Sequence, residues 1–533
     1  MTCTLEHPTL GKIQGNANSG VMQFLNVKYA ALSHRFGCPV LYEGAGSSDV
    51  IDATKIGPAA IAGKNSCYEE YALIQQKLPV PDFPPMSDTE CLNLNITVPN
   101  VQTHGKGLPV LVWVHGGALL VGSGTWPQYD FAALVRRSVE LGTPFIGITI
   151  NYRTGIFGFL TSEELRAAGF QANNGLRDQK IAFQWIKKNI AGFGGDPNQV
   201  TAIGQSAGGI SLTLLLQSSQ PLFQRLASIA GTCLLGRPVP LFVHEMVYEL
   251  FCEAQGLTGL SGQDRIKAIE KIPSEELSSK VPPSVPALPA LDSDFLCALP
   301  TFQSAEGWSK GGNPAIPGLK WCKELLVGDM KDDGTIFDRA LAHRIQDIAS
   351  AFEESLKRNI PQQGKAIDSL LSAYHISSST SDRAAYLSIL ELGNDIAFYI
   401  PEETFARRFP GTTYVYHLNE PNPWDGPFKG FASHLFDVAL LFRNYDSQLP
   451  VHAIEVGHAF GDGLIKFANG QAPWQASTQS KPVAWVFGGD AGTGELREDV
   501  PENVGRRNAI FEFKDTLGWD ALYEAWTGFI GQR

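Results

Sequence analysis

A serine occupies the centre of the G-x-S-x-G pattern Gly204-Gln-Ser206-Ala-Gly208. The pattern follows a segment that predicts a strand and precedes one that predicts a helix, the setting in which a nucleophilic serine is presented on a sharp turn. Glycines are needed there because bulky neighbours would collide across so tight a turn. The N-terminus of the following helix favours negative charge, and the N–H of Ala207 can stabilise an oxyanion. We therefore predict Ser206 as a nucleophile rather than a serine in a glycine-rich helix cap.

A serine hydroxyl needs a base to take its proton and an acid to orient that base, and in folds with this turn the chain order is Ser, Asp or Glu, then His. His434 lies in a loop of small residues that enters an apolar helix, so its imidazole can lean over the edge of a sheet. His417 lies in an apolar, strand-like segment and is expected to be structural. We predict His434 as the base.

Three aspartates qualify by position as the acid. Asp329, Asp332 and Asp333 directly follow the apolar segment 325–328, which predicts a strand. A carboxylate just past the C-terminal end of a strand can reach a histidine at the same edge of the sheet. Position alone leaves all three open, beside the interpretation that they form a solvated turn.

The oxyanion also needs backbone N–H donors. The run His115-Gly-Gly-Ala118 follows the apolar segment 109–115, as the oxyanion loop follows an early strand in this kind of fold. We predict donors from this loop together with Ala207, and we expect His115 to stabilise the loop.

Apolar runs and amphipathic segments alternate along the first part of the chain. This alternation predicts an α/β fold with a mainly parallel central sheet and helices on both faces, extended at one edge by antiparallel N-terminal strands. Later amphipathic segments predict a helical cap, and we expect one domain over residues 1–533 with helical cap insertions in the second half. The expected strands are 11–14, 21–29, 109–115, 145–150, 199–203, 226–230 and 325–328, and the expected helices are 130–140, 174–190, 207–216, 344–374 and 384–399.

Composition excludes several function classes. The 533 residues carry a net charge of -12, which argues against nucleic-acid binding. The longest apolar stretch, 108–121, is too short to span a membrane. The N-terminus shows no secretory signal, so we expect a cytoplasmic protein, or a secreted one if a leader has been removed. The eight cysteines show no C-x-x-C spacing and H-E-x-x-H is absent, so no metal and no cofactor are implied. The oligomeric state stays open.

Four longer motifs resemble the type-B carboxylesterase/lipase family, which includes cholinesterases and fungal lipases. They are residues 193–209 around the serine, 90–99 (Glu-Cys-Leu-Asn-Leu-Asn-Ile-Thr-Val-Pro), 151–160 (Asn-Tyr-Arg-Thr-Gly-Ile-Phe-Gly-Phe-Leu) and 174–179 (Asn-Gly-Leu-Arg-Asp-Gln). The resemblance runs from about residue 10 to the C-terminus. It implies an α/β-hydrolase fold and a serine ester hydrolase.

The resemblance also implies roles for individual residues. An acid directly ahead of a glycine selects Asp333, where the family usually has Glu, and a Gly-x-x-His loop matches His434. Gly117 and Ala118 become oxyanion donors, and Ala118 stands where the family commonly has a third glycine, so its methyl group narrows the space for bulky alcohol groups.

A disulfide and a substrate class follow from the same resemblance. It implies that Cys67 pairs with Cys91, although a cytoplasmic location speaks against the bond. The segment between them lacks the tryptophan with which cholinesterases bind a quaternary ammonium group, which argues against choline esters. The expected activity is hydrolysis of a neutral, largely apolar ester, a small-molecule substrate. The alternatives are acyl transfer or cyclisation in a biosynthetic pathway and, remotely, a non-catalytic binding module, which the intact serine, acid and histidine disfavour.

Overall fold

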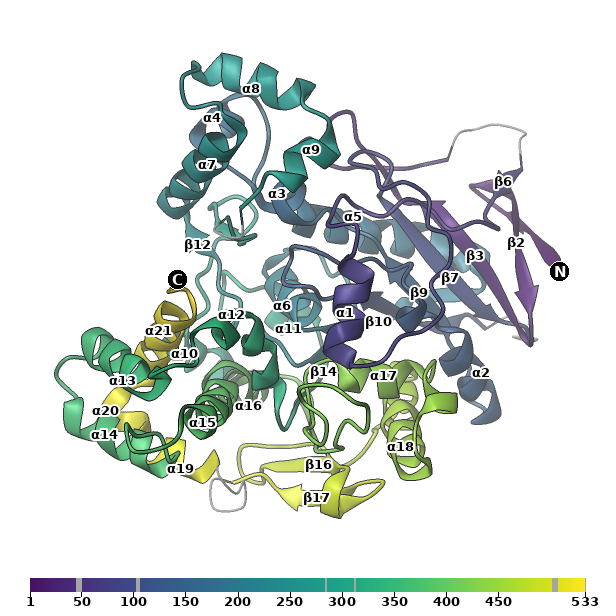
Figure 1. The fold of residues 1–533 in the computed structure, drawn as a ribbon. Helices are drawn as coiled ribbons and strands as arrows, with labels where there is room; N and C mark the ends of the chain where they lie inside the picture. The colour runs from purple at the N-terminus through teal and green to yellow at the C-terminus, as the bar shows by residue number, and fades with distance from the viewer. Residues whose placement is uncertain (45–49, 102–105, 283–284, 311–312, 501–506, 533) are drawn as a thin grey trace.

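The computed structural model describes residues 1–44, 50–101, 106–282, 285–310, 313–500 and 507–532. Among these residues, one sheet of 13 strands runs through the molecule (Figure 1). Its strands in spatial order are β1 (Thr2–His7), β2 (Gly11–Asn18), β3 (Val21–Lys28), β7 (Asn93–Pro99), β9 (Ile146–Ile150), β8 (Leu108–Val114), β10 (Gly195–Gln205), β11 (Arg225–Ile229), β14 (Glu324–Met330), β15 (Thr412–Leu418), β16 (Val483–Phe487) and β17 (Glu495–Glu498), with β6 (Ile51–Asp52) beside β2.

The centre of the sheet is parallel and its ends are antiparallel. Every pairing from β9 through β8 to β16 is parallel. The N-terminal strands β1, β2 and β3 pair antiparallel and reach the centre through β7. The predicted mainly parallel sheet with an antiparallel N-terminal edge is therefore confirmed. The central strands β8 and β9 are buried along nearly their whole length, as strands covered on both faces must be.

Helices cover both faces of this sheet. The chain passes from β8 to β9 through α2 (Ala132–Glu140), then returns across β8 to β10 through α5 (Asn174–Asn189), and continues to β11 through α6 (Ala207–Leu214). Right-handed crossovers that run in opposite directions place their helices on opposite faces. Thus α2 lies on one face, where α18 (Val451–Ala468) packs against it, and α5 and α6 lie on the other.

The remaining helices surround the C-terminal ends of the strands and the outer half of the sheet. The structure has two helices, α13 (Ile348–Asn359) and α14 (Gly364–Ala373), in place of the one helix predicted over 344–374. The further α-helices are α1 (Ser66–Ile74), α3 (Gly155–Phe159), α4 (Glu163–Ala167), α7 (Leu241–Gln255), α8 (Gly262–Lys271), α9 (Ser274–Ser279), α10 (Phe302–Ala305), α11 (Gly318–Trp321), α12 (Asp338–Leu341), α13 (Ile348–Asn359), α14 (Gly364–Ala373), α15 (Asp382–Asn394), α16 (Ile400–Arg408), α17 (Phe436–Phe442), α19 (Asn508–Phe511), α20 (Lys514–Leu517) and α21 (Trp519–Ile530).

The buried apolar side chains form two clusters. The larger one fills both faces of the sheet. The smaller one joins α3 and α4 to α7, α8 and α9, which lie together at the top of Figure 1. Short strands β12 (Val239–Pro240) and β13 (Ala290–Leu291) lie beneath that group, and β4 (Ala30–Ala31) pairs with β5 (Val40–Leu41). The division into one domain with cap insertions stays a prediction.

Candidate active site

Ser206 lies on the turn between β10 and α6. Its backbone has φ 54° and ψ -124°, a strained conformation for a residue with a side chain, and its N–H donates to Ile229 O at 2.8 Å. The turn closes only because Gly208 has no side chain, since a Cβ there would collide with the carbonyl oxygen of Val114 on β8. The predicted order of strand, serine and helix is therefore present, and Ala207 begins α6 next to the serine.

His434 and Asp333 form a buried hydrogen-bonded pair at the same edge of the sheet. His434 Nδ1 and Asp333 Oδ1 are 2.6 Å apart, and the second oxygen of Asp333 accepts the N–H of Met330 at 2.7 Å. The His434 N–H donates to Thr335 Oγ1 at 3.1 Å, which fixes the histidine loop to the turn after β14. Of the three aspartates that position left open, the structure joins Asp333 to His434.

The other two aspartates have different partners. Asp329 contacts His417 Nδ1 at 2.6 Å and the guanidinium of Arg507. Asp332 accepts the N–H of Ala432 at 3.0 Å, and its own N–H donates back to Ala432 O at 3.0 Å. Asp332 therefore holds the loop that carries the predicted base, while Asp329 belongs to an ion-pair group on β14 and β15.

The second ring nitrogen of His434 has an unexpected partner. Gln205, the residue before the serine, places its side-chain nitrogen 3.1 Å from His434 Nε2. Both side chains are buried. Among the hydrogen bonds of the described residues, none joins Ser206 to His434. The sequence pattern contains Gln205, but nothing in it indicates that this side chain turns toward the histidine.

Acidic groups from two further elements surround His434. Burial lowers the pKa of His434 to about 4, against the opposing effects of Asp437 on α17 and Glu70 on α1. Burial raises the pKa of Asp333 well above its ordinary value, and the nearby Asp329 adds to the effect. Glu70 accepts hydrogen bonds from Gln128 Nε2 at 2.8 Å and Tyr129 Oη at 2.5 Å. Sequence reasoning missed both acidic residues: only the fold brings Glu70 on α1 to the histidine, whereas Asp437 lies just after His434 in the chain but carries no motif.

The loop after β8 reaches the serine from the other side. A Cβ built on Gly116 would lie 3.3 Å from Ser206 Cβ. Gly117 has φ 99°, and Ala118 has φ 55°, a region that favours glycine. The N–H groups of Leu120 and Val121 donate to Gly117 O at 3.0 and 3.1 Å. For the Gly117 and Ala118 N–H groups, the described residues supply no acceptor.

His115 supports this loop. Its ring stacks on Tyr152 with centroids 4.3 Å apart, and its Nδ1 lies 2.9 Å from Gly116 O. Tyr152 Oη donates to His115 O at 2.9 Å. Burial lowers the pKa of His115 to about 4, so the ring is neutral at physiological pH.

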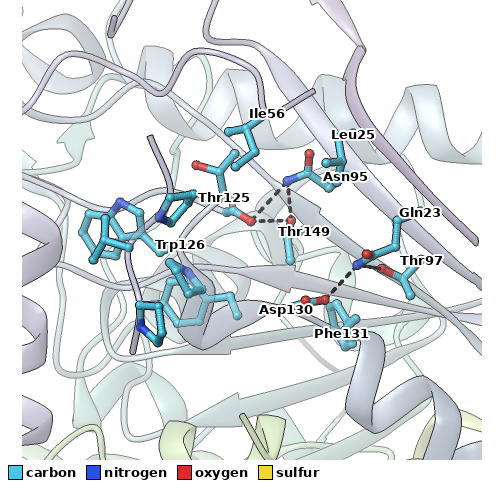
Figure 2. Close-up of a pocket in the computed structure, with 16 residues that line it drawn as sticks. Gln23, Leu25, Ile56, Asn95, Thr97, Thr125, Trp126, Asp130, Phe131 and Thr149 are labelled. Atoms are coloured by element: carbon cyan, nitrogen blue, oxygen red, sulfur yellow. Dashed lines mark hydrogen bonds between the residues drawn. The ribbon is translucent and has the colours of Figure 1, made fainter. Parts of the chain in front are cut away.

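Two cavities lie beside the segment that follows the loop at 115–118, one of about 410 Å³ and one of about 370 Å³, and neither is lined by the serine or the histidine. In the larger one, polar side chains bond to each other (Figure 2): Gln23 Nε2 donates to Asp130 Oδ1 at 2.8 Å, and Asn95 Nδ2 donates to Thr149 Oγ1 at 3.1 Å. Asn95 is the acceptor residue of the glycosylation sequon at 95–97, and its amide is engaged inside the protein.

The disulfide implied by the resemblance is not formed. Cys67 and Cys91 are free, buried thiols, and burial raises their pKa values to about 11 and about 12. Within the described ranges, no cluster of three or more His, Cys, Asp or Glu side chains could hold a metal ion. In the same part of the chain, no helix is both long and apolar enough to cross a membrane.

Comparisons with known proteins bear on the family and the fold. The model of the carboxylesterase family matches residues 3–490. The para-nitrobenzyl esterase of Bacillus subtilis is 31% identical over 492 residues, which cover 88% of this chain and 90% of that protein. Lipase 3 of Yarrowia lipolytica is 29% identical over 488 residues, covering 88% and 89%. A solved structure titled PNB esterase has a TM-score of 0.71 at 24% identity, covers 95% of this chain and 99% of its own, and shows the same fold. The chain belongs to the carboxylesterase family and is a serine hydrolase with the α/β-hydrolase fold.

Proposed function

We propose that Ser206, His434 and Asp333 are the catalytic residues of this serine ester hydrolase. The observation that carries the proposal is the 2.6 Å contact between His434 Nδ1 and Asp333 Oδ1, in a histidine whose Nε2 lies 3.1 Å from Gln205 at the strained serine turn. Asp333 keeps the ring proton on Nδ1, so that Nε2 carries the lone pair that takes the proton of Ser206. The low pKa of His434 keeps its ring neutral and ready to act as a base.

The reaction then has two halves. Ser206 Oγ bonds to the ester carbonyl carbon while its proton passes to His434 Nε2, and the carbonyl oxygen becomes an oxyanion held by the N–H groups of Gly117, Ala118 and Ala207. The intermediate collapses, the alcohol leaves with the proton from His434, and the acyl group stays on the serine. Water attacks this acyl-enzyme by the same route and releases the acid.

The proposed substrate is a small, neutral, largely apolar carboxylic ester. The net charge of -12 disfavours anionic substrates. Glu70 and Asp437 are buried near the histidine, and burial raises the pKa of each, to about 7 for Asp437. They therefore add less negative charge to the site than ionised carboxylates would. The left-handed backbone of Ala118 sets its methyl group at the oxyanion loop, which favours esters of small alcohols.

The test is the release of p-nitrophenol from p-nitrophenyl esters of increasing acyl length, with the acyl product identified. Ser206→Ala should abolish turnover, whereas Ser211→Ala, which removes another buried serine on α6, should not. Free acid as the only acyl product supports hydrolysis. Transfer of the acyl group to an added alcohol or amine in preference to water contradicts it.

We further propose that the enzyme works in the cytoplasm. All eight cysteines are free, as is usual for proteins in a reducing compartment. Peptide mapping of the protein isolated from its native source checks this assignment, which a Cys67–Cys91 disulfide would contradict.

A further inference from the structure

The side chain of Gln205 contacts His434 Nε2, the nitrogen that takes the serine proton in the proposed reaction. His434 Nδ1 faces Asp333, so this nitrogen carries the ring proton and Nε2 carries the lone pair. The side-chain NH₂ of Gln205 lies 3.1 Å from that lone pair and donates to it. The reverse orientation of the amide would set its oxygen against the lone pair and is therefore unfavourable. The base of the resting enzyme is thus already hydrogen-bonded, and its donor is not Ser206.

The other end of the same amide is unsatisfied. Gln205 Oε1 is buried and has no hydrogen-bond partner among the described residues. It packs beside the oxyanion loop, since a Cβ built on Gly116 would lie 3.1 Å from it. A buried acceptor without a donor costs free energy. The unsatisfied Oε1 therefore offsets part of the free energy that the amide gains from its hydrogen bond to His434. The side chain is therefore held at the histidine by one hydrogen bond only.

We infer that Gln205 is a positioning residue that holds the base nitrogen of His434 in the resting enzyme and must release it before Ser206 can be deprotonated. This inference rests on the proposed roles of Ser206 and His434. No covalent step is added: one hydrogen bond, from Gln205 Nε2 to His434 Nε2, is exchanged for one from Ser206 Oγ. After proton transfer Nε2 becomes a donor, and the NH₂ of Gln205 can no longer bond to it.

The hydrogen bond from Gln205 also affects the pKa of His434. A donor to the lone pair favours neutral imidazole, so its loss raises the pKa of His434 and moves the acid limb of the reaction to higher pH. The other titratable groups facing His434 are Asp333 on the turn after β14, Asp437 on α17 and Glu70 on α1. Burial raises the pKa of Glu402 on α16, and Asp333 and Asp437 in turn raise it further. None of these changes in a Gln205 variant.

The experiment measures the rate at which a neutral p-nitrophenyl phosphonate labels the serine between pH 4 and pH 9. Gln205→Leu removes the donor and keeps similar bulk. It should label about fivefold faster at pH 8 and shift the acid limb up by about 0.7 pH units, the effect of one neutral hydrogen bond. Gln205→Glu should shift the acid limb further, because a carboxylate favours the imidazolium ion. Gln255→Leu, which deletes a buried amide on α7, should match wild type.

The variants distinguish a positioning role of Gln205 from a space-filling role. If folded Gln205→Leu labels at the wild-type rate with an unshifted acid limb, Gln205 only fills space and the inference is wrong. If Gln205→Leu does not fold, an unshifted acid limb in the isosteric Gln205→Glu is equally decisive. If wild type itself is not labelled at any pH, the proposed function fails instead.

Discussion

At the scale of single residues, the site depends on which aspartate meets the histidine. Three aspartates within five positions of the chain end in three environments: Asp333 at His434, Asp332 at the backbone of the histidine loop, and Asp329 between His417 and Arg507. Their order along the chain cannot distinguish them, because the direction in which a side chain points changes from one position to the next.

Asparagine substitutions separate these roles. Asp333→Asn should lower kcat on a p-nitrophenyl ester by about 10⁴-fold, because an amide cannot fix the proton on Nδ1. Asp332→Asn should change kcat by less than about tenfold, since an amide oxygen can still accept the Ala432 N–H. Steady-state kinetics with circular dichroism on both folded variants checks this. Equal losses in the two variants would contradict the assignment of Asp333.

At the same scale, the sequence predicted the nucleophile and base but missed their surroundings. Ser206 and His434 could be singled out because a motif and a loop of small residues surround them. Gln205 and Asp437 could not, because their effects on the histidine depend on side-chain direction, and Glu70 could not, because it lies on a helix far from His434 in the chain.

At the scale of elements, two backbone segments position the reacting groups: the turn between β10 and α6 and the loop after β8. Both segments depend on the close approach of backbone atoms from neighbouring elements. The N–H of Ser206 bonds to the end of β11, Gly208 faces the backbone of β8, and Gly204 faces the backbone at the start of α6. The predicted β10, α6 and β8 are present because their apolar runs and glycines are local signals. Residues 344–374 form two helices, α13 and α14, because Pro361 and Gly364 interrupt the segment, a local signal that the prediction of one helix overlooked.

The serine turn gives a packing prediction. Gly208→Ala should destabilise the protein by about 3 kcal/mol or more, or prevent folding, because the added Cβ collides with Val114 O. Gly364→Ala at the start of α14, where a Cβ meets open space, should be neutral or stabilising by up to about 1 kcal/mol. Urea unfolding compares the two variants. Equal stability would show that the turn tolerates a side chain.

The oxyanion loop gives a specificity prediction. Ala118→Gly should relieve the left-handed strain, worth about 1 kcal/mol, and raise the kcat/KM ratio of tert-butyl to methyl esters about tenfold, because the methyl group no longer limits the alcohol. Ala230→Gly relieves a similar strain, at φ 47°, and should leave the ratio unchanged. An unchanged ratio in Ala118→Gly would remove Ala118 from the specificity determinants.

At the scale of the whole molecule, buried histidines couple stability to pH in opposite directions. His434 has a pKa of about 4 in the folded protein against 6.5 for a free imidazole, so the unfolded chain binds more protons between these values. Its contribution is present above pH 6.5 and is lost as the pH falls toward 4. Burial opposes charge on His417, but Asp329 and Asp499 override it and raise its pKa to about 9. Its contribution is present below pH 6.5 and is lost as the pH rises through 9.

The contribution of His434 can be measured by comparing the pH dependence of stability in wild type and in a variant without this histidine. His434→Gln removes the titrating ring, so the change in unfolding free energy between pH 6.5 and pH 4 should be smaller than in wild type by about 3 kcal/mol. His343→Gln, which replaces an exposed histidine, should follow the wild-type curve. Urea unfolding at a series of pH values provides the data. Parallel curves for wild type and His434→Gln would contradict a neutral buried His434.

The central claim is that Ser206, activated by His434, forms a covalent intermediate. Its most direct test is peptide mapping by mass spectrometry after reaction with a neutral phosphonate, for wild type, Ser206→Ala and His434→Gln. We predict one label per wild-type molecule, on Ser206, none in Ser206→Ala, and labelling at least about 100-fold slower in His434→Gln. A label on another residue, or unchanged labelling without His434, would contradict the account.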